Sequence, residues 1–442
     1  MFNGGLPCHN LLGHPARQLS LLYGLAHTKV FAMNSPLPTS VQPPVQATDL
    51  AALPLIEKWI SFASVSRDSN LPIIEWTQNW LEALGVECTR TYDDSGKKAN
   101  LWATLPANDG ETKIGGLVLS GHTDVVPVDG QPWETDPFVA QIIGDRMYGR
   151  GVTDMKSYGA TALMMVPELL KRKLKRPVHL AFSYDEEVGC IGVRRMIADM
   201  VKSGYQPAAC IVGEPTGMQV VVAHKGKHAY KTSVRGFEAH SSLTPQGVNA
   251  VEIACEFVTN LKSMHRQLAK DGPFDPIYDV PHTTIHTGVI HGGTALNIIP
   301  RDCDVTWEIR HHHMNSPEDL FTQAKAFADS LLPAMRAVAA DTSITHHLIS
   351  VLPGFATEAD SEIAKLCFTC AGTDSSNGSS SAAGKVSFGT EAALFHQAGV
   401  PTIVCGPGHI AQAHQPNEWV ELAQLAWCER FMRRLADHIC VN

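Results

Sequence analysis

Short runs of branched apolar residues recur along the chain, and polar residues follow each run. The runs lie at residues 117–119, 177–183, 208–212 and 401–405. Continuous apolar runs of this length are typical of strands buried on both faces of a sheet. Between them, apolar residues at three- and four-residue spacing predict helices over 48–63, 71–84 and 155–173. The sequence therefore predicts an α/β fold, with a mainly parallel sheet and helices on both faces.

The pattern changes between residues 228 and 341. Alternating residues and β-branched runs predict strands over 230–236, 283–300 and 303–312, and helices over 250–270 and 317–332. We interpret this region as a smaller inserted α+β domain, two helices on an antiparallel sheet, that acts in dimerisation or as a lid. The catalytic domain then comprises residues 46–227 and 342–442. A free edge of the inserted sheet could pair across a two-fold axis, so a homodimer is expected.

Composition narrows the class of protein. The 442 residues are too many for one compact core, and 44% hydrophobic with 18% charged residues is an ordinary globular composition. The net charge of −9 argues against nucleic acid as a partner, and no apolar run reaches the ~18 residues of a membrane span. Eleven cysteines without a regular framework indicate free thiols in the cytoplasm. We interpret residues 1–45 as a poorly ordered N-terminal extension.

Polar side chains gather where the predicted strands end. His122 and Asp124 follow the run at 117–119, and residues two apart on a strand point to the same face. A histidine ligand usually donates its second ring N–H to an acceptor, and Asp124 could be that acceptor. Asp154 precedes a helix after the glycine-rich segment GRGVTDMKS. It is either an N-cap or a carboxylate held at the carboxyl edge of the sheet.

Further acids follow two other strands. Residues Asp185 to Glu187 come after the run at 177–183, and they either spread into water or surround a positive charge. Glu214 ends the run at 208–212, and His414 follows the run at 401–405. Imidazoles and carboxylates are ligands that zinc, cobalt or manganese accept. Five such side chains suit two metal ions that share one carboxylate. The set comprises His122, Asp154, Glu187, Glu214 and His414.

From Leu53 to its C-terminus the chain resembles the di-metal aminoacylase and exopeptidase family. This family contains acetylornithine deacetylases, succinyl-diaminopimelate desuccinylases and glutamate-releasing carboxypeptidases. The resemblance rests on six blocks in a fixed order: SGHTDVVPVDG, GRGVTDMKSYGA, SYDEEVGCIGVRR, VGEPT, RGFEAHSS and GPGHIAQAHQPNE. The blocks DEEVGCIG, GEPTGMQVVVAHKG and IAQAHQPNE are most similar to those of acetylornithine deacetylases.

The resemblance implies a role for each site residue. His122 and Glu214 would hold one metal, Glu187 and His414 the other, and Asp154 would bridge them. The metals would be Zn²⁺ or Co²⁺, with Mn²⁺ as another option. Asp124 would orient His122, and Glu186 would be the general base. A carboxylate within one hydrogen bond of a metal-activated water can take its proton at neutral pH.

Four further residues have a candidate functional role, and three of them also have a second interpretation. His240 resembles the family histidine that reaches a neighbouring subunit's site, but it also fits a helix start. Asn297 and Arg310 could bind the substrate's α-carboxylate, because Arg offers a bidentate fork, although Arg310 lies in a His-rich end that suits a surface. Glu391 could recognise a substrate amine or act as a helix-start acid.

Three functions are compatible with these observations. The first is removal of the acetyl group from N2-acetyl-L-ornithine, which yields ornithine and acetate in arginine biosynthesis. The second keeps the chemistry with another substrate, as in a desuccinylase, a dipeptidase or another N-acyl amino-acid hydrolase. The third is a catalytically idle binding protein, against which the complete ligand set and Glu186 argue.

Overall fold

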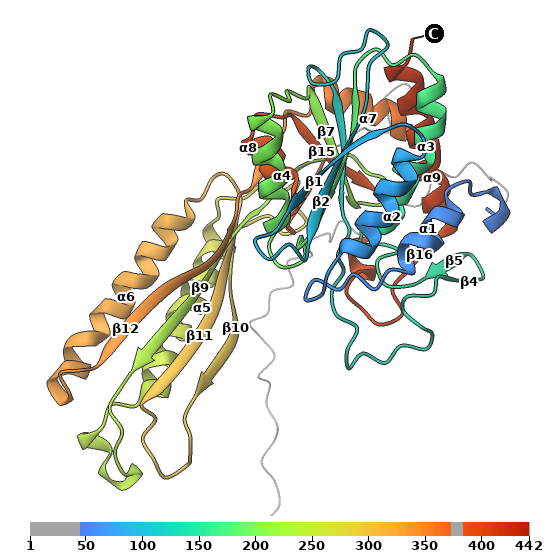
Figure 1. Cartoon of the computed structure of the whole chain (residues 1–442). Helices are drawn as coiled ribbons and strands as arrows, with labels where there is room; N and C mark the ends of the chain where they lie inside the picture. Colours follow the sequence, from blue (N-terminus) through green and yellow to red (C-terminus); the bar gives the residue numbers. More distant parts are fainter. Residues whose placement is uncertain (1–44, 373–382, 442) are drawn as a thin grey trace, which may run out of the picture. The chain divides into compact units, whose positions relative to one another are not determined.

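The structure of the protein is a computed structural model that describes residues 45–372 and 383–441. The expected N-terminal extension at 1–45 therefore lies almost entirely outside the described residues. Two sheets dominate the described part of the chain: a nine-stranded mixed sheet and a four-stranded antiparallel sheet (Figure 1). A third, three-stranded sheet is formed by short segments.

The large sheet is parallel at its centre and antiparallel toward its edges. Its spatial order is β1 (Glu87–Tyr92), β2 (Ala99–Leu105), β6 (Val178–Ser183), β3 (Leu117–His122), β7 (Ala209–Pro215), β15 (Thr402–Gly406), β8 (Val221–His224) and β13 (Phe355–Ala356). The strand β14 (Gly384–Val386) pairs with β8. The four central strands β6, β3, β7 and β15 are mutually parallel. The expected α/β fold with a mainly parallel sheet is confirmed.

Helices cover both faces of this sheet (Figure 1). The large core on one face is formed with α1 (Leu53–Ile60), α2 (Leu71–Glu82), α3 (Lys156–Lys171), α7 (Glu362–Ala371) and α9 (Leu422–Ile439). The other face carries α4 (Ile191–Lys202) and α8 (Ala392–Gln397), which contact each other. Pro54 stands in the first turn of α1, where its missing N–H costs no hydrogen bond.

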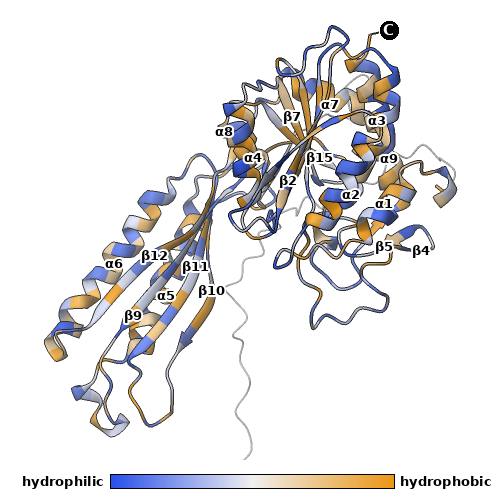
Figure 2. Ribbon diagram, viewed as in Figure 1, coloured by the Kyte–Doolittle hydropathy of each residue, from blue (hydrophilic) through white to orange (hydrophobic). Residues whose placement is uncertain are grey.

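The central strands β3, β6 and β15 are buried along their whole length, and β7 along all but its first residue, as their apolar runs predict. Every residue of β2, β3 and β6 is buried. In the hydropathy view the hydrophobic colour concentrates on this sheet and on the inner sides of its helices (Figure 2). Polar residues at the ends of such strands therefore lie where a hydrophobic core gives way to loops.

The four-stranded sheet has the spatial order β10 (Thr284–Gly292), β11 (Asp302–His311), β9 (Gly226–Arg235) and β12 (Ser343–Leu352), and all its pairs are antiparallel. The helices α5 (Ala250–Asp271) and α6 (Pro317–Val338) pack on it around Trp307, Phe257 and Tyr230. Two helices on an antiparallel sheet were expected here, but β12 was not. Its sequence alternates around histidines and buries only Ile344 and Leu352, so the strand pattern is not visible in the sequence. The domain bounds 228–341 stay a prediction, although the strands of this sheet run from residue 226 to 352.

The smallest sheet joins the end of the chain to a hairpin in its first half. It consists of β16 (Trp419–Glu421), β5 (Arg146–Tyr148) and β4 (Gln141–Ile143), and β16 pairs with β5. The sequence of residues 141–148 predicts a short hairpin, which is confirmed, but it does not predict the pairing with β16. This pairing places residues just before Trp419 beside the glycine-rich segment that precedes α3.

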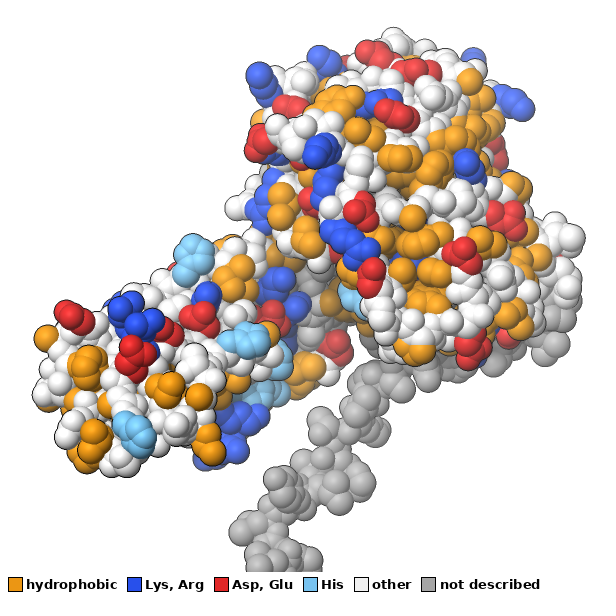
Figure 3. Space-filling view, turned by 60° about the horizontal axis from the view of Figure 1, so that its bottom comes forward, with side chains coloured by type: hydrophobic (Ala, Val, Ile, Leu, Met, Phe, Trp, Pro, Cys, Tyr) orange, Lys and Arg blue, Asp and Glu red, His pale blue; other side chains and the backbone are white. Residues whose placement is uncertain are grey.

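The surface and the helices of the described residues add two observations. On the face drawn in Figure 3, acidic and basic side chains are interspersed, so charge of one sign is not gathered there. No helix in the described ranges is long and apolar enough to cross a lipid bilayer.

The buried His179 of β6 makes the fold sensitive to acid. Its ring stacks on Trp102 at 4.8 Å between centroids, and burial lowers its pKa to about 4. An unfolded histidine has a pKa of about 6.5. Unfolding therefore takes up a proton between these values, and this contribution to stability is lost as the pH falls from about 6.5 toward 4.

We expect His179→Phe, which keeps the aromatic stacking, to reduce the loss of unfolding free energy between pH 7 and 4.5 by about 2 kcal/mol. Urea unfolding of both proteins at both pH values measures this difference. The Thr104 hydroxyl contacts His179 Nδ1 at 3.0 Å and loses this partner in the variant. The loss is the same at both pH values, so it cancels when the unfolding free energies at pH 7 and 4.5 are subtracted. An equal loss in the two proteins would contradict the prediction.

Candidate metal centre

Five side chains from separate segments meet at the carboxyl edge of the large sheet. His122 is the last residue of β3, and Glu214 lies near the end of β7, the parallel neighbour of β3. Glu187 follows β6, Asp154 precedes α3, and His414 lies in the loop after β15. Because parallel strands end at the same edge of a sheet, residues far apart in sequence come together there.

These side chains form two groups that share Asp154. In the first group, His122 Nε2 lies 2.9 Å from Asp154 Oδ1 and 3.7 Å from Glu214 Oε1. In the second, His414 Nε2 lies 3.2 Å from Asp154 Oδ2 and 3.0 Å from Glu187 Oε2. The ligand atoms within each group lie within 4.8 Å of one another. The two carboxylate oxygens of Asp154 therefore face different groups.

The electrostatics of the cluster favour positive charge within it. Burial raises the pKa of Glu187 to about 7 and that of Glu214 well above its ordinary value. The negative charge of the neighbouring Asp154 raises both pKa values further. Hydrogen bonds to Asp154 and Glu187 raise the pKa of His414 to about 10. Asp154 differs, because hydrogen bonds from His122 and His414 outweigh its burial and lower its pKa. Glu187 and Glu214 are expensive to ionise in this buried cluster unless cations pair with them. The donor set and its charge therefore fit two divalent cations.

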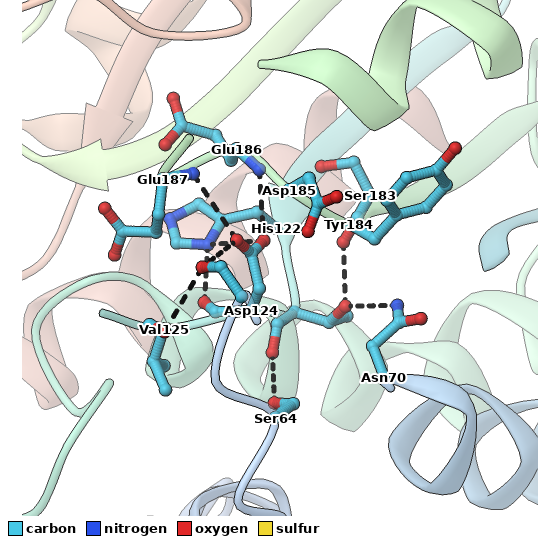
Figure 4. Close-up of polar contacts among 12 residues, drawn as sticks. Ser64, Asn70, His122, Asp124, Val125, Ser183, Tyr184, Asp185, Glu186 and Glu187 are labelled. Carbon is cyan, nitrogen blue, oxygen red and sulfur yellow. Dashed lines mark hydrogen bonds and ion pairs between the residues drawn. The ribbon is translucent and has the colours of Figure 1, made fainter. Parts of the chain in front are cut away.

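Asp124 is placed as expected, but different atoms make its contacts (Figure 4). His122 Nδ1 donates to the main-chain carbonyl of Asp124 at 2.8 Å, whereas the carboxylate lies 3.6 Å from the same nitrogen. The carbonyl oxygen is thus the nearer acceptor and holds the proton on Nδ1, and the orienting role of the Asp124 carboxylate stays a prediction. Nε2 is left to face Asp154. The Asp124 carboxylate instead accepts from the Ser66 hydroxyl at 2.7 Å and from the N–H groups of Glu186 and Glu187.

The three acids after β6 have separate environments (Figure 4). Asp185 pairs with Lys98 at 2.6 Å, and Glu187 faces His414. Glu186 accepts a hydrogen bond from the thiol of Cys190 at 3.0 Å, and burial raises its pKa to about 8. Of the two alternatives for this acidic strand end, spreading into water is not what the structure shows: one acid pairs with a lysine, and the other two lie at the cluster.

Three further predicted residues lie in or near the four-stranded sheet. His240 is exposed and caps the short 3-10 helix Ser241–Gln246, where its ring accepts from the Ser242 N–H. Asn297 is its neighbour, because the Asn297 carbonyl accepts from the Ser241 N–H at 3.1 Å. Arg310 lies on β11 and pairs with Glu308 at 2.8 Å. The functional roles of these residues stay predictions.

Glu391 is fully buried at the N-terminus of α8. One carboxylate oxygen accepts from the Ser120 hydroxyl at 2.6 Å, and the other accepts from the Ser183 hydroxyl at 2.7 Å. Ser120 lies on β3, and Ser183 ends β6. Glu391 therefore stands at the start of α8 without a side-chain hydrogen bond to the helix, and both of its predicted roles, helix-start acid and recognition of a substrate amine, stay predictions.

Two charged residues near the cluster were missed in the sequence. Glu418 and Arg150 form a buried ion pair at 2.8 Å, and Glu418 also accepts the main-chain N–H of Asp154 at 3.1 Å. Both lie inside blocks that carry the family resemblance, GRGVTDMKSYGA and GPGHIAQAHQPNE. Their place within these blocks was the available signal for a role near the site. Two residues of opposite charge in such blocks could also have been predicted to pair, because a buried charge needs a partner.

The fold and the cluster define a hydrolase of the metallopeptidase type, and the comparisons identify its family. The chain belongs to peptidase family M20/M25/M40, whose family model matches residues 118–438. A relative from Proteus mirabilis (strain HI4320), named acetylornithine deacetylase, is 31% identical over 422 residues. The match covers 92% of this chain and 99% of that relative.

Solved structures share the fold at lower sequence identity. An M20 family metallo-carboxypeptidase from Sulfolobus solfataricus has a TM-score of 0.67 and 17% identity, over 87% of this chain and 98% of that one. A dinuclear metal-binding peptidase of the M20 family from Bacillus subtilis has a TM-score of 0.62 and 13% identity, over 88% of this chain and 98% of that one. At these identities the likeness supports the fold alone.

Proposed function

We propose that the protein removes the acetyl group from N2-acetyl-L-ornithine and releases L-ornithine and acetate, as a step of arginine biosynthesis. The observation that carries the hydrolytic part is the shared Asp154, whose two oxygens face two groups of metal-ligating side chains. The substrate is inferred from the relatives, since the Proteus mirabilis protein, which this chain matches over 99% of its length, bears that activity's name.

Two divalent cations, Zn²⁺ or Co²⁺ with Mn²⁺ as an alternative, fit the cluster. His122 and Glu214 would hold one, Glu187 and His414 the other, and Asp154 would contact both. Such ions lower the pKa of water and polarise a carbonyl oxygen. The Bacillus subtilis protein, which shares this fold, is a dinuclear metal-binding peptidase, and two ions are the number proposed here.

Glu186 would act as the general base and then as the general acid. Its carboxylate takes a proton from the water that attacks the acetyl carbonyl carbon, and the same proton passes to the amine as the C–N bond breaks. Asp124 accepts the main-chain N–H of Glu186 at 3.2 Å, and the Cys190 thiol donates to its side chain. These two contacts orient the carboxylate before substrate arrives.

The remaining predicted roles complete the proposal. Asn297 and Arg310 would bind the substrate's α-carboxylate, Glu391 would recognise its amine, and His240 would reach the site of a second subunit. The division into a catalytic domain at 46–227 and 342–442 and a dimerisation or lid domain at 228–341 belongs to the same proposal. Ten cysteines of the described part are free thiols, which supports a reducing compartment such as the cytoplasm.

A substrate panel tests the proposal. With zinc or cobalt added, we expect kcat/KM for acetate release from N2-acetyl-L-ornithine to exceed that for N-succinyl-diaminopimelate and for dipeptides by at least about tenfold, a factor equal to ~1.4 kcal/mol in transition-state binding. A higher kcat/KM for the succinylated substrate or a dipeptide would favour the alternative substrates. Metal analysis that finds no bound ion, together with no turnover, would favour a binding protein.

A further inference from the structure

Glu418 makes an unusually complete set of contacts beneath the candidate metal centre. It precedes β16, and its side chain is only 1% exposed. One carboxylate oxygen accepts the N–H groups of Thr153 at 2.9 Å and Asp154 at 3.1 Å, and the other accepts the N–H of Gly151 at 3.1 Å. Three main-chain N–H groups in the segment that leads to Asp154 therefore donate to one carboxylate.

Arg150 extends these contacts toward the second group of ligands. Its Nη1 donates to Glu418 at 2.8 Å, and its Nη2 donates to Gln131 Oε1 at 2.5 Å. Gln131 in turn donates from Nε2 to the main-chain carbonyl of His414 at 3.0 Å. Glu418, Arg150 and Gln131, here called the Glu418 network, thus connect the backbone of Asp154 with the backbone of His414.

Both backbone segments need such support because neither belongs to a helix or strand. Gly151 has a φ of +87°, and a Cβ there would lie 2.9 Å from Val125 Cγ1, so a residue with a side chain would be strained at this position. His414 has a φ of +63°, which is unfavourable for a side-chain-bearing residue. Conformations of this kind persist only when surrounding contacts hold them.

We infer that Glu418 is a positioning residue for the metal centre: it holds the backbone that presents Asp154 directly, and the backbone that presents His414 through Arg150 and Gln131. The Glu418 side chain contacts the main chain of Asp154 and not its ligand oxygens. The inference rests on the proposed function for the ligand roles of Asp154 and His414. Outer partners of metal ligands commonly set metal affinity by 10- to 100-fold.

Glu418→Gln tests the carboxylate with little change in volume. Its amide has one acceptor oxygen and one NH₂ group, which cannot accept a main-chain N–H. In a cobalt(II) titration of metal-free protein, followed by visible absorption, we expect about 10- to 100-fold weaker binding, with kcat lowered more than KM is changed. Gln131→Ala, which removes a less buried member of the network, is expected to weaken binding about tenfold without loss of folding.

Glu429→Gln is the matched control. Glu429 is also a buried carboxylate that accepts a main-chain N–H, that of Ala52 at 2.8 Å, but it lies on α9 and outside the network. This control should lose thermal stability and keep the cobalt affinity of the parent. The inference is overturned if Glu418→Gln and Gln131→Ala bind cobalt as the parent does, or if the control weakens binding equally.

Hydrogen exchange separates this inference from the proposed function. In metal-free protein, amides of residues 149–154 should exchange at least about tenfold faster in Glu418→Gln than in the parent or in Glu429→Gln, because a tenfold change corresponds to the loss of about one such hydrogen bond. If the parent protein binds no cobalt and hydrolyses no substrate, the proposed function is refuted. Faster exchange of residues 149–154 in Glu418→Gln would still support the positioning role. Unchanged exchange in this segment overturns the positioning role even in an active enzyme.

Discussion

Glu186→Gln is expected to lower kcat for N2-acetyl-L-ornithine by about 10³-fold or more, which is within the range of a positioned general base. Glutamine keeps the size of the side chain and can still accept the hydrogen bond that the Cys190 thiol donates at 3.0 Å. It cannot take a proton from water at neutral pH. Metal content and KM should therefore stay near those of the parent, and the loss should lie in kcat.

Asp185→Asn is the matched control for this variant. Asp185 is the neighbouring acid and has a φ of +53°, a conformation that asparagine tolerates well. Its carboxylate pairs with Lys98 rather than with the cluster. We expect kcat to stay within a few-fold of the parent. Turnover by Glu186→Gln near the parent rate, measured as acetate release, would refute the assignment of the base.

Asp154→Ala is expected to have the second large effect, because both groups of ligands depend on this residue. Its Oδ1 faces His122 and its Oδ2 faces His414. The variant should bind less than one metal ion per chain instead of two, and kcat/KM should fall by about 10³-fold or more, given the contribution of metal ions to such hydrolysis. Elemental analysis after gel filtration, with kinetics on the same sample, measures both quantities.

Single-group variants distinguish a shared ligand from a general disruption. Glu214→Ala and His414→Ala each remove a member of one group only, so each should retain about one ion of the proposed pair. Far-UV circular dichroism should be unchanged in all three variants, since the cluster lies at the edge of the sheet. Asp154→Ala protein that still binds two ions as tightly as the parent would show that Asp154 is not shared.

Part of this structure follows directly from local pattern. Apolar runs such as 117–119 identify strands buried on both faces, because only such strands exclude polar residues from both sides. Turn and helix-start chemistry placed Asp154 before α3. The strand β12 was not predicted, because its histidine-rich alternating sequence buries little apolar surface. The pairing of β16 with β5 was not predicted, because it joins segments more than 250 residues apart. The residue pattern within one segment does not indicate which distant segment will pair with it.

The sequence by itself determined which residue types end the central strands, and hence the candidate ligands and the base. Tertiary structure alone decided that two oxygens of Asp154 face different groups, that the carbonyl rather than the carboxylate of Asp124 holds the His122 proton, and that Glu391 is enclosed by two serines. It also brought Glu418 beneath Asp154. The reason is physical: residue order records which groups a chain carries, whereas hydrogen-bond partners depend on distances of a few ångströms that only packing sets.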